Sequence, residues 1–125
     1  MAEKYLIDTN VIIDFSENKL LPGAKSLVAS IIDSDPYLSI INKIELLGFS
    51  HVSDYILELV DVANILGLTD NIVDKTIAIR KSKKIKLPDA IIAATTIEHH
   101  LLLVTRNMAD FQNIKGLKII NPDTV

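Results

Sequence analysis

The chain contains no cysteine and no tryptophan, and aromatic residues make up only 5% of its 125 residues. Without cysteine, disulfide bonds and thiolate metal sites are excluded, and a reducing compartment is permitted. The core must therefore be aliphatic, and hydrophobic residues are plentiful at 49% of the chain. A chain of this length suits one domain with one core, and we expect that domain to span residues 1–125.

Long hydrophobic runs are also missing from the sequence. No segment approaches the roughly 20 apolar residues that a membrane-spanning helix needs. The N-terminal stretch MAEKYLIDTN lacks the extended apolar region of a signal peptide, so we expect a soluble, cytoplasmic protein. The net charge of −3 disfavours a general nucleic-acid coat protein, but it is compatible with a nuclease because metal-binding carboxylates make a chain acidic.

Short apolar segments alternate with amphipathic ones along the chain. We expect strands at 5–7, 37–41, 60–66, 101–107 and 117–122. We expect helices after residue 8, at 24–33, 43–49 and 53–59, from 69 or 70 into the basic segment 80–86, from 88 to about 99, and a turn or short helix at 108–111. This alternation predicts an α/β fold with a mostly parallel sheet that has helices on both faces.

Two residue types mark the expected starts of helices. Asn42 is a predicted N-cap, with Glu45 three residues later as in a capping box. Pro88 suits the first turn of a helix, where its missing N–H has no cost.

Acidic residues follow several of the predicted strands. Asp8 ends the first strand, Glu45 lies in the helix after the second, and Asp89 lies at a helix start. Asn107 and Asp110 follow a later strand. Functional groups of open α/β sheets collect at the carboxyl ends of the strands, so these side chains can meet at one edge. Clustered carboxylates raise each other's pKa or require a cation, and oxygen ligands suit Mg²⁺ or Mn²⁺.

Each acidic residue except Asp8 also has a simple structural explanation. Asp89 could cap its helix, Glu45 could complete a capping box, and Asp110 could lie in a surface turn. Asp8 lies between two apolar segments, which a solvated turn explains poorly. The interpretation as a metal site therefore depends on the combination of these residues.

Four segments, LIDTNVIID, NKIELLGF, LPDAIIAAT and LVTRNMADF, occur here in the order found in PIN-domain ribonucleases. The chain resembles that family over essentially its whole length, and most closely its VapC-type toxins of toxin–antitoxin pairs. The resemblance implies a PIN-like three-layer α/β/α sandwich acting as an endoribonuclease dependent on Mg²⁺ or Mn²⁺. The implied substrate is single-stranded or structured RNA such as tRNA, and the implied products carry a 5′ phosphate and a 3′ hydroxyl.

Residue by residue, Asp8, Glu45 and Asp89 match the first three acidic positions of the family. The resemblance implies that they bind the metal and carry catalysis. The fourth position holds Asn107, and Asp110 lies three residues further on, so the fourth ligand stays open between these two. The resemblance also implies supporting roles for polar neighbours of the acids, namely Thr9, Asn10 and Thr105.

A basic segment, RKSKKIK, comes just before the third acidic position. It contains Arg80, Lys81, Lys83, Lys84 and Lys86. One interpretation is that these side chains bind RNA phosphates beside the predicted site. The other is a solvated helix end, where cations interact favourably with the helix dipole. The sequence favours neither over the other.

The resemblance further implies two protein partners. One is a second copy of the chain, for which the apolar helix faces around residues 24–32 and 53–66 are candidates. The other is a small antitoxin whose apolar helix and basic tail would cover the acidic site.

Other classes of protein stay open at this point. Because Asn107 occupies the fourth position, a PIN-like RNA-binding module with an incomplete, inactive metal site is the main alternative. A phosphatase with an aspartate nucleophile ranks lower because the segment DTN lacks a second aspartate. A receiver domain also ranks low because it would need an early acidic pair.

Overall fold

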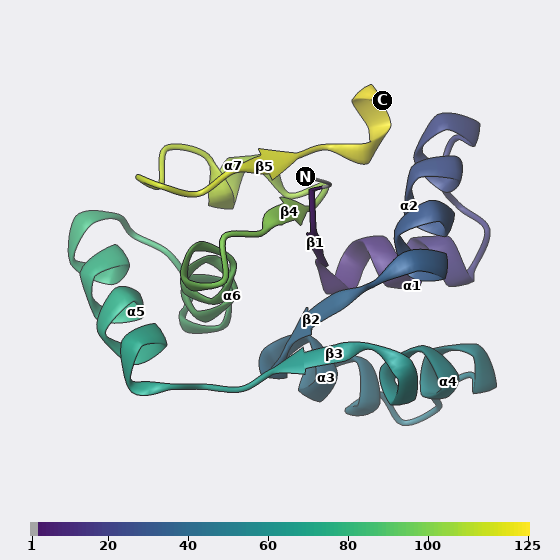
Figure 1. Ribbon diagram of the computed structural model, residues 1–125, viewed down its shortest axis with the longest axis horizontal. Coiled ribbons are helices and arrows are strands. Elements are labelled where there is room, and N and C mark those ends of the chain that lie inside the picture. Colours follow the sequence, from purple (N-terminus) through teal and green to yellow (C-terminus); the bar gives the residue numbers. More distant parts are fainter. Residues whose placement is uncertain (1–2) are drawn as a thin grey trace.

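The computed structural model describes residues 3–125. Its sheet has five strands in the order β3-β2-β1-β4-β5, and all neighbouring strands are parallel. The strands are β1 (Tyr5–Ile7), β2 (Tyr37–Ser39), β3 (Asn64–Leu66), β4 (Leu102–Val104) and β5 (Ile119–Ile120). Helices cover both faces of the sheet, which confirms the predicted α/β/α sandwich (Figure 1).

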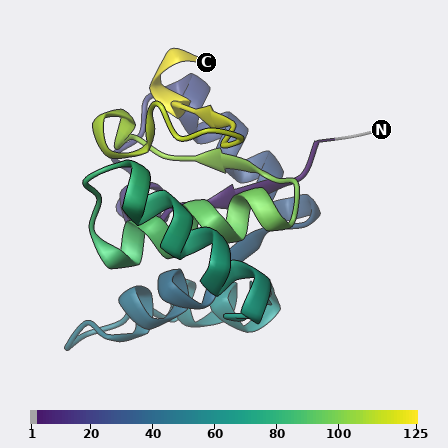
Figure 2. The same ribbon diagram turned by 90° about the vertical axis from the view of Figure 1, so that its left-hand side faces the viewer.

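The helices are α1 (Thr9–Ser16), α2 (Pro22–Ser34), α3 (Ile40–Leu47), α4 (Asp54–Val62), α5 (Asp70–Ser82), α6 (Leu87–Glu98) and α7 (Met108–Phe111), followed by a 3-10 helix, η1 (Pro122–Thr124). Helices α5 and α6 lie on one side of the sheet, while α1, α2 and α4 lie on the other (Figure 1). Figure 2 shows α5 and α6 side by side in front of the strands. Within residues 3–125, no helix has the length and apolar character needed to cross a membrane.

The central strands supply an apolar side chain to each face because successive strand residues point in opposite directions. Leu6 of β1 is paired with Leu103 of β4, and both belong to the core under α5 and α6. Ile7 and Val104, also paired, belong to the core under α1, α2 and α4. Because both faces of these strands are buried, their sequences are continuously apolar and do not alternate between apolar and polar residues.

Helix α6 is the most deeply buried helix on its face of the sheet. Seven consecutive residues, Ala90 to Thr96, are buried, so this helix has no polar face along most of its length. A helix that is apolar all round is stable only when other elements enclose it, and α6 lies between the sheet and α5. Asp89 comes directly before this buried stretch and therefore has a fixed position at the start of α6.

Several predicted boundaries differ from the structure. The predicted strand 60–66 is wrong in its first half, because Val60 to Val62 belong to α4 and only Asn64–Leu66 is a strand. Ile56, Leu59 and Val60 are buried at helical spacing, so packing decided the conformation over the β-propensity of valine. Helix α2 begins at Pro22, before the predicted start at residue 24. Strand β1 has its predicted bounds, whereas β2, β4 and β5 end earlier than predicted.

The start of α3 also differs from the prediction. Ser39 is its N-cap, and the Ser39 hydroxyl accepts a hydrogen bond from the Asn42 N–H at 3.1 Å. In return, Asn42 Oδ1 accepts from the Ser39 N–H at 2.9 Å. The capping box therefore lies one turn earlier than predicted, with Asn42 as its second member. Glu45 has no part in it, and its side chain is left for another role.

Candidate functional site

Asp8 lies where β1 passes into α1. Its backbone N–H donates to the Val104 carbonyl at 2.9 Å, so the sheet still holds this residue. The residue is only 6% exposed. Its Oδ1 accepts from the Thr9 N–H at 2.9 Å and its Oδ2 from the Thr105 hydroxyl at 2.8 Å.

Burial of the Asp8 carboxyl raises its pKa to about 6. The hydrogen bonds from Thr105 and Thr9 act against this increase, while the charges of Asp89 and Glu45 add to it. Burial and the charges of two other carboxylates thus disfavour the ionised form of Asp8. A cation bound nearby would stabilise that form.

Glu45 reaches the same edge from α3. This helix follows β2 and contacts both α1 and α6, which places it between Asp8 and Asp89. The Thr9 hydroxyl donates to Glu45 Oε1 at 2.7 Å. Asn42 Nδ2 in turn donates to the Thr9 hydroxyl oxygen at 3.0 Å, so the Thr9 hydroxyl is directed toward Glu45.

Asn42 is therefore a site residue that the sequence reasoning missed. It is fully buried, and both ends of its amide are used, one in the capping box and one on Thr9. The spacing between Asn42 and Glu45 could have indicated this role, because residues three apart on a helix lie on the same side of it.

Asp89 lies in the first turn of α6 and is half-buried. Lys86 is the N-cap and makes no side-chain capping bond, so the explanation of Asp89 as a helix cap is wrong. Burial raises the pKa of Asp89, and the charges of Asp110 and Glu45 raise it further, while Lys86 acts in the opposite direction. Its acidity is thus coupled to acids on two other elements.

Asn107 and Asp110, the two candidates for the fourth ligand, are hydrogen-bonded to each other. Asn107 is the N-cap of α7, and its Nδ2 donates to Asp110 Oδ2 at 2.7 Å. The Asp110 N–H donates back to Asn107 Oδ1 at 3.3 Å. The Asn107 N–H donates to the Thr105 hydroxyl at 3.0 Å, which ties this pair to the residue that holds Asp8.

The donor set at this edge fits a hard divalent cation, because all its candidate ligand atoms are oxygen, and because burial and the charges of neighbouring acids raise the pKa of Asp8 and of Asp89. Asn10 Oδ1, in the first turn of α1, is a further buried oxygen that has no hydrogen-bond partner within residues 3–125. In the conformations of these side chains, no group of three Asp, Glu or His residues among residues 3–125 is close enough to share one ion. The edge therefore has the composition of a metal site without a closed ligand set.

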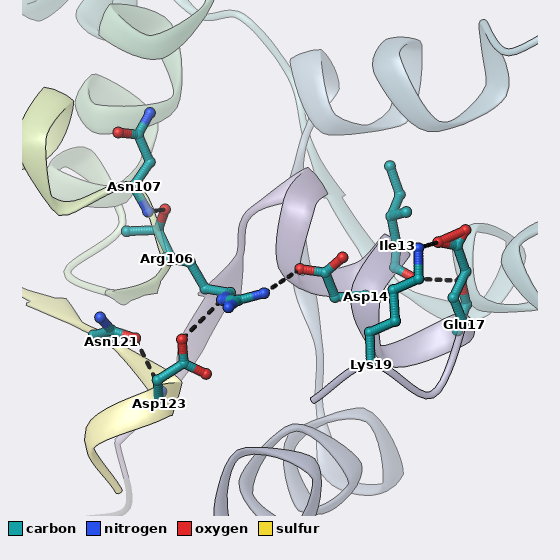
Figure 3. Close-up of polar contacts among 10 residues, drawn as sticks. Ile13, Asp14, Glu17, Lys19, Arg106, Asn107, Asn121 and Asp123 are labelled. Atoms are coloured by element: carbon teal, nitrogen blue, oxygen red, sulfur yellow. Dashed lines mark hydrogen bonds and ion pairs between the residues drawn. The ribbon is translucent and has the colours of Figure 1, made fainter. Parts of the chain in front are cut away.

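A cluster of ion pairs lies beside this edge. Arg106 Nη1 contacts Asp14 Oδ2 at 2.6 Å, and Arg106 Nε contacts Asp123 Oδ2 at 2.8 Å (Figure 3). These bonds join the loop after β4 to α1 and to η1. The two carboxylates raise the pKa of Arg106, which therefore stays charged. Together with Asn10 and Asn107, the three residues line an open depression of about 320 Å³.

The basic segment, residues 80–86, covers the last turn of α5 and the connection from α5 to α6. Arg80 and Lys81 lie in the last turn of α5, where the helix-end interpretation placed them. Lys83 and Lys84 join them around an open depression of about 390 Å³. Four of the five predicted RNA-binding residues are exposed, whereas Lys83 is half-buried, and its Nζ donates to the backbone carbonyls of Asp110 and Gln112 at 2.8 and 2.6 Å.

Comparison with known proteins gives the family. The PIN domain family matches residues 5–117, so the chain belongs to this family and the predicted resemblance is confirmed. Membership also removes the phosphatase and receiver-domain alternatives. No curated protein sequence matches the chain.

Several solved structures have a similar fold, and one of them is a toxin–antitoxin complex. A chain of a toxin–antitoxin complex from Klebsiella pneumoniae is 30% identical, with a TM-score of 0.77 and coverage of 95% of this chain and 98% of that one. A chain of FitAcB from Neisseria gonorrhoeae is 26% identical, with a TM-score of 0.76 and coverage of 97% and 99%. A third similar structure is VapBC2 from Rickettsia felis, solved with a bound DNA fragment from the VapBC2 promoter. One of its chains is 20% identical to this chain, with a TM-score of 0.73 and coverage of 94% of this chain and 97% of that one. At this identity the similarity shows the fold alone.

Proposed function

We propose that this PIN-domain protein is an endoribonuclease dependent on Mg²⁺ or Mn²⁺, and that it is the cytoplasmic toxin of a VapBC-type toxin–antitoxin pair. We further propose that one PIN-like domain spans residues 1–125. The observation that carries the proposal is that Asp8, Glu45 and Asp89 come from three separate elements to one edge of the sheet, where burial first and then the charges of neighbouring acids raise the pKa of Asp8 and of Asp89.

In this proposal Asp8 and Asp89 hold the ion, Glu45 completes the site, and Asn107 or Asp110 supplies the fourth ligand. When bound, the ion would activate a water molecule and stabilise charge on the phosphodiester. The protein's own polar groups prepare the carboxylates for this task. Thr105 and Thr9 hold the Asp8 carboxylate, and Thr9 and Asn42 orient Glu45.

The basic segment, residues 80–86, supplies positive charge for an RNA substrate. Arg80, Lys81, Lys84 and Lys86 are exposed, and Lys86 is close enough to Asp89 to act against the increase in its pKa. Phosphates held by these side chains would therefore lie next to the acidic edge, and we expect their contribution to fall with rising salt.

An antitoxin partner is supported by one of the similar structures, the toxin–antitoxin complex from Klebsiella pneumoniae, which is 30% identical to this chain. Large apolar side chains are exposed on two helices that contact each other, α3 and α4, and on the segment between them: Ile44, Leu47, Phe49, Tyr55, Leu57 and Val62. An apolar antitoxin helix could cover such a surface.

A homodimer is proposed as well, and the structure changes the surface to consider. Of the two predicted faces, that of residues 24–32 uses Ala24, Val28 and Ile31 in the core of the chain itself. The face of residues 53–66 keeps Leu57 and Val62 exposed, so it is the better candidate.

The proposal is tested with Asp8→Asn and Asp89→Asn, assayed for Mn²⁺-dependent cleavage of a mixed RNA. We expect cleavage to fall to background in both variants because each removes a principal ligand, while circular dichroism shows that both fold. Asp61→Asn is the matched control, since it removes an exposed carboxylate of α4 far from the edge in the topology. Wild-type rates in both test variants would reject the proposal.

The residue at the fourth acidic position of the family, Asn107, supports one alternative function. Asn107 brings no charge there, and its amide is bonded to Asp110. A PIN-like RNA-binding module with an inactive metal site would bind RNA through the basic segment without cutting it. In the same assay, wild-type protein that retains RNA in a filter-binding test but leaves it intact at saturating Mn²⁺ would favour this alternative.

A further inference from the structure

Lys83 uses its ammonium group differently from the other basic residues around it. Its Nζ donates to the carbonyl oxygens of Asp110 at 2.8 Å and of Gln112 at 2.6 Å. It is the C-cap residue of α5 and is half-buried, whereas Lys84 next to it is exposed. Two of the three N–H bonds of the ammonium are thus used within the protein.

The two carbonyl groups belong to the end of α7. Asp110 lies in that helix and Gln112 is its C-cap. A cation at the C-terminal end of a helix is favourable, and charge-assisted hydrogen bonds are stronger than neutral ones. Lys83 therefore ties the end of α5 to the end of α7.

Helix α7 needs such a tie because it is only four residues long. A helix of one turn has no stability of its own, so contacts with the rest of the protein must set its position. Phe111 supplies one contact, since it is 1% exposed in the core under α5 and α6. Lys83 supplies a second contact, made to the backbone on either side of Phe111.

The position of α7 matters because this helix carries Asp110, whose charge acts on Asp89 more strongly than that of Glu45, and because its N-cap is Asn107. The side chain of Asp110 is bonded to Asn107, and its charge acts on Asp89 from across the site. A shift of the α7 backbone would move Asn107 and Asp110 together, whereas Asp8 and Glu45 would keep their own hydrogen bonds.

We propose that Lys83 is a positioning residue, which holds α7 so that Asn107 and Asp110 face Asp89, and that it does not contact the RNA. The metal-related part of this proposal rests on the proposed function. The commitment of Lys83 to two carbonyls separates it from Arg80, Lys81, Lys84 and Lys86, which have no such bonds to α7 within residues 3–125.

The test compares Lys83→Met, Lys83→Arg and the matched control Lys84→Met in the full chain. Hydrogen exchange of the backbone amides of residues 107–113 is measured without metal, and Mn²⁺ binding is measured by calorimetry. RNA cleavage then gives kcat and KM separately. The first two measurements do not depend on catalysis.

For Lys83→Met we expect faster exchange in residues 107–113 and a Mn²⁺ affinity about 10- to 100-fold weaker, as for other groups that orient metal ligands. We expect kcat to fall similarly while KM for RNA stays within about twofold. Lys83→Arg should restore most of each loss, because a guanidinium can donate to both carbonyls. Lys84→Met should raise KM and leave exchange and Mn²⁺ affinity as in the wild type.

Wild-type exchange and Mn²⁺ affinity in Lys83→Met would overturn the proposal, as would a pure KM effect like that of Lys84→Met. If Lys83→Met does not fold, exchange in Lys83→Arg decides, since exchange as slow as in the wild type supports the role and faster exchange rejects it. An absence of RNA cleavage by the wild type would reject the proposed function, while the exchange result would still decide the role of Lys83.

Discussion

The two halves of the candidate site are held by different kinds of contact. Asp8 lies at the end of a central strand, is buried, and accepts hydrogen bonds from Thr9 and Thr105. Asp110 lies in the one-turn helix α7, is half-buried, and depends on Lys83 for the position of its backbone. The sheet fixes the first half, which we call the strand half, whereas side chains tie the second, the α7 half, to its neighbours.

This difference has an energetic side. Burial raises the pKa of Asp8 to about 6, so an ionised Asp8 destabilises the folded protein until a cation neutralises it. The α7 half avoids part of that cost by staying more exposed. The site thus combines a buried acid of raised pKa at the end of a strand with a half-buried acid on a one-turn helix.

The largest expected effect is a loss of stability on raising the pH of the metal-free protein. Asp8 releases its proton at about pH 6 when folded and at about pH 4 when unfolded. The folded state therefore binds more protons in that window, and the free energy of unfolding should fall by about 2 kcal/mol from pH 4 to pH 6 and by about 3 kcal/mol in all by about pH 8. Urea unfolding across this range measures the change.

Two variants tell which half causes this pH dependence. Asp8→Asn should remove most of the fall, and the remainder would come from Asp89, whose pKa is also raised. Asp110→Asn should retain most of the fall. A pH profile unaffected by Asp8→Asn would show that the strand half does not cause this pH dependence.

The next effect concerns the donor that holds Asp8. Thr105→Val removes a fully buried hydroxyl that donates to Asp8 and accepts from the Asn107 N–H, without changing the side-chain volume much. We expect a loss of about 2–3 kcal/mol in the free energy of unfolding at pH 7.5, since a buried charged acceptor loses its donor. Thr105→Ser, which keeps the hydroxyl, should lose less, and equal losses in both variants would contradict this account.

The smallest expected effect concerns the Arg106 cluster next to the site. Arg106→Gln breaks both ion pairs, but the three side chains are partly exposed, and such pairs contribute at most about 1 kcal/mol. We expect a small loss of stability that shrinks at high salt, with Mn²⁺ affinity unchanged. A strong loss of Mn²⁺ binding in this variant would mean that the cluster is part of the site.

Much of the fold could be predicted from local pattern. The apolar run before Asp8, Pro88 at a helix start and the alternation of strands with helices all follow from residue types that act over a few positions. The errors came where local signals compete. Val60 and Val62 read as a strand, yet Ile56 and Leu59 on the same helix provide the buried face that keeps them helical.

The candidate site could likewise be predicted only in part from the sequence. Asp8 could be singled out because a carboxylate between two apolar segments is unusual, whereas Glu45 and Asp89 were predicted only from the combination of acids and from the family resemblance. The bonds that place them could not be predicted, since the Thr9–Glu45 and Thr105–Asp8 pairs lie 36 and 97 residues apart in the chain. The acceptors of Lys83 are backbone carbonyls, which every residue has and which leave no mark in the sequence.

The capping box of α3 ends in asparagine, where the longer glutamate or glutamine is more usual. Asn42 closes the box with its oxygen and steers Thr9 with its nitrogen, so one side chain sets both the beginning of a helix and the direction of a hydroxyl 33 residues away. A glutamate there would keep the cap and lose the donor. Only a side chain that carries both an acceptor and a donor can therefore close the cap of α3 and orient the Thr9 hydroxyl toward Glu45 at the same time.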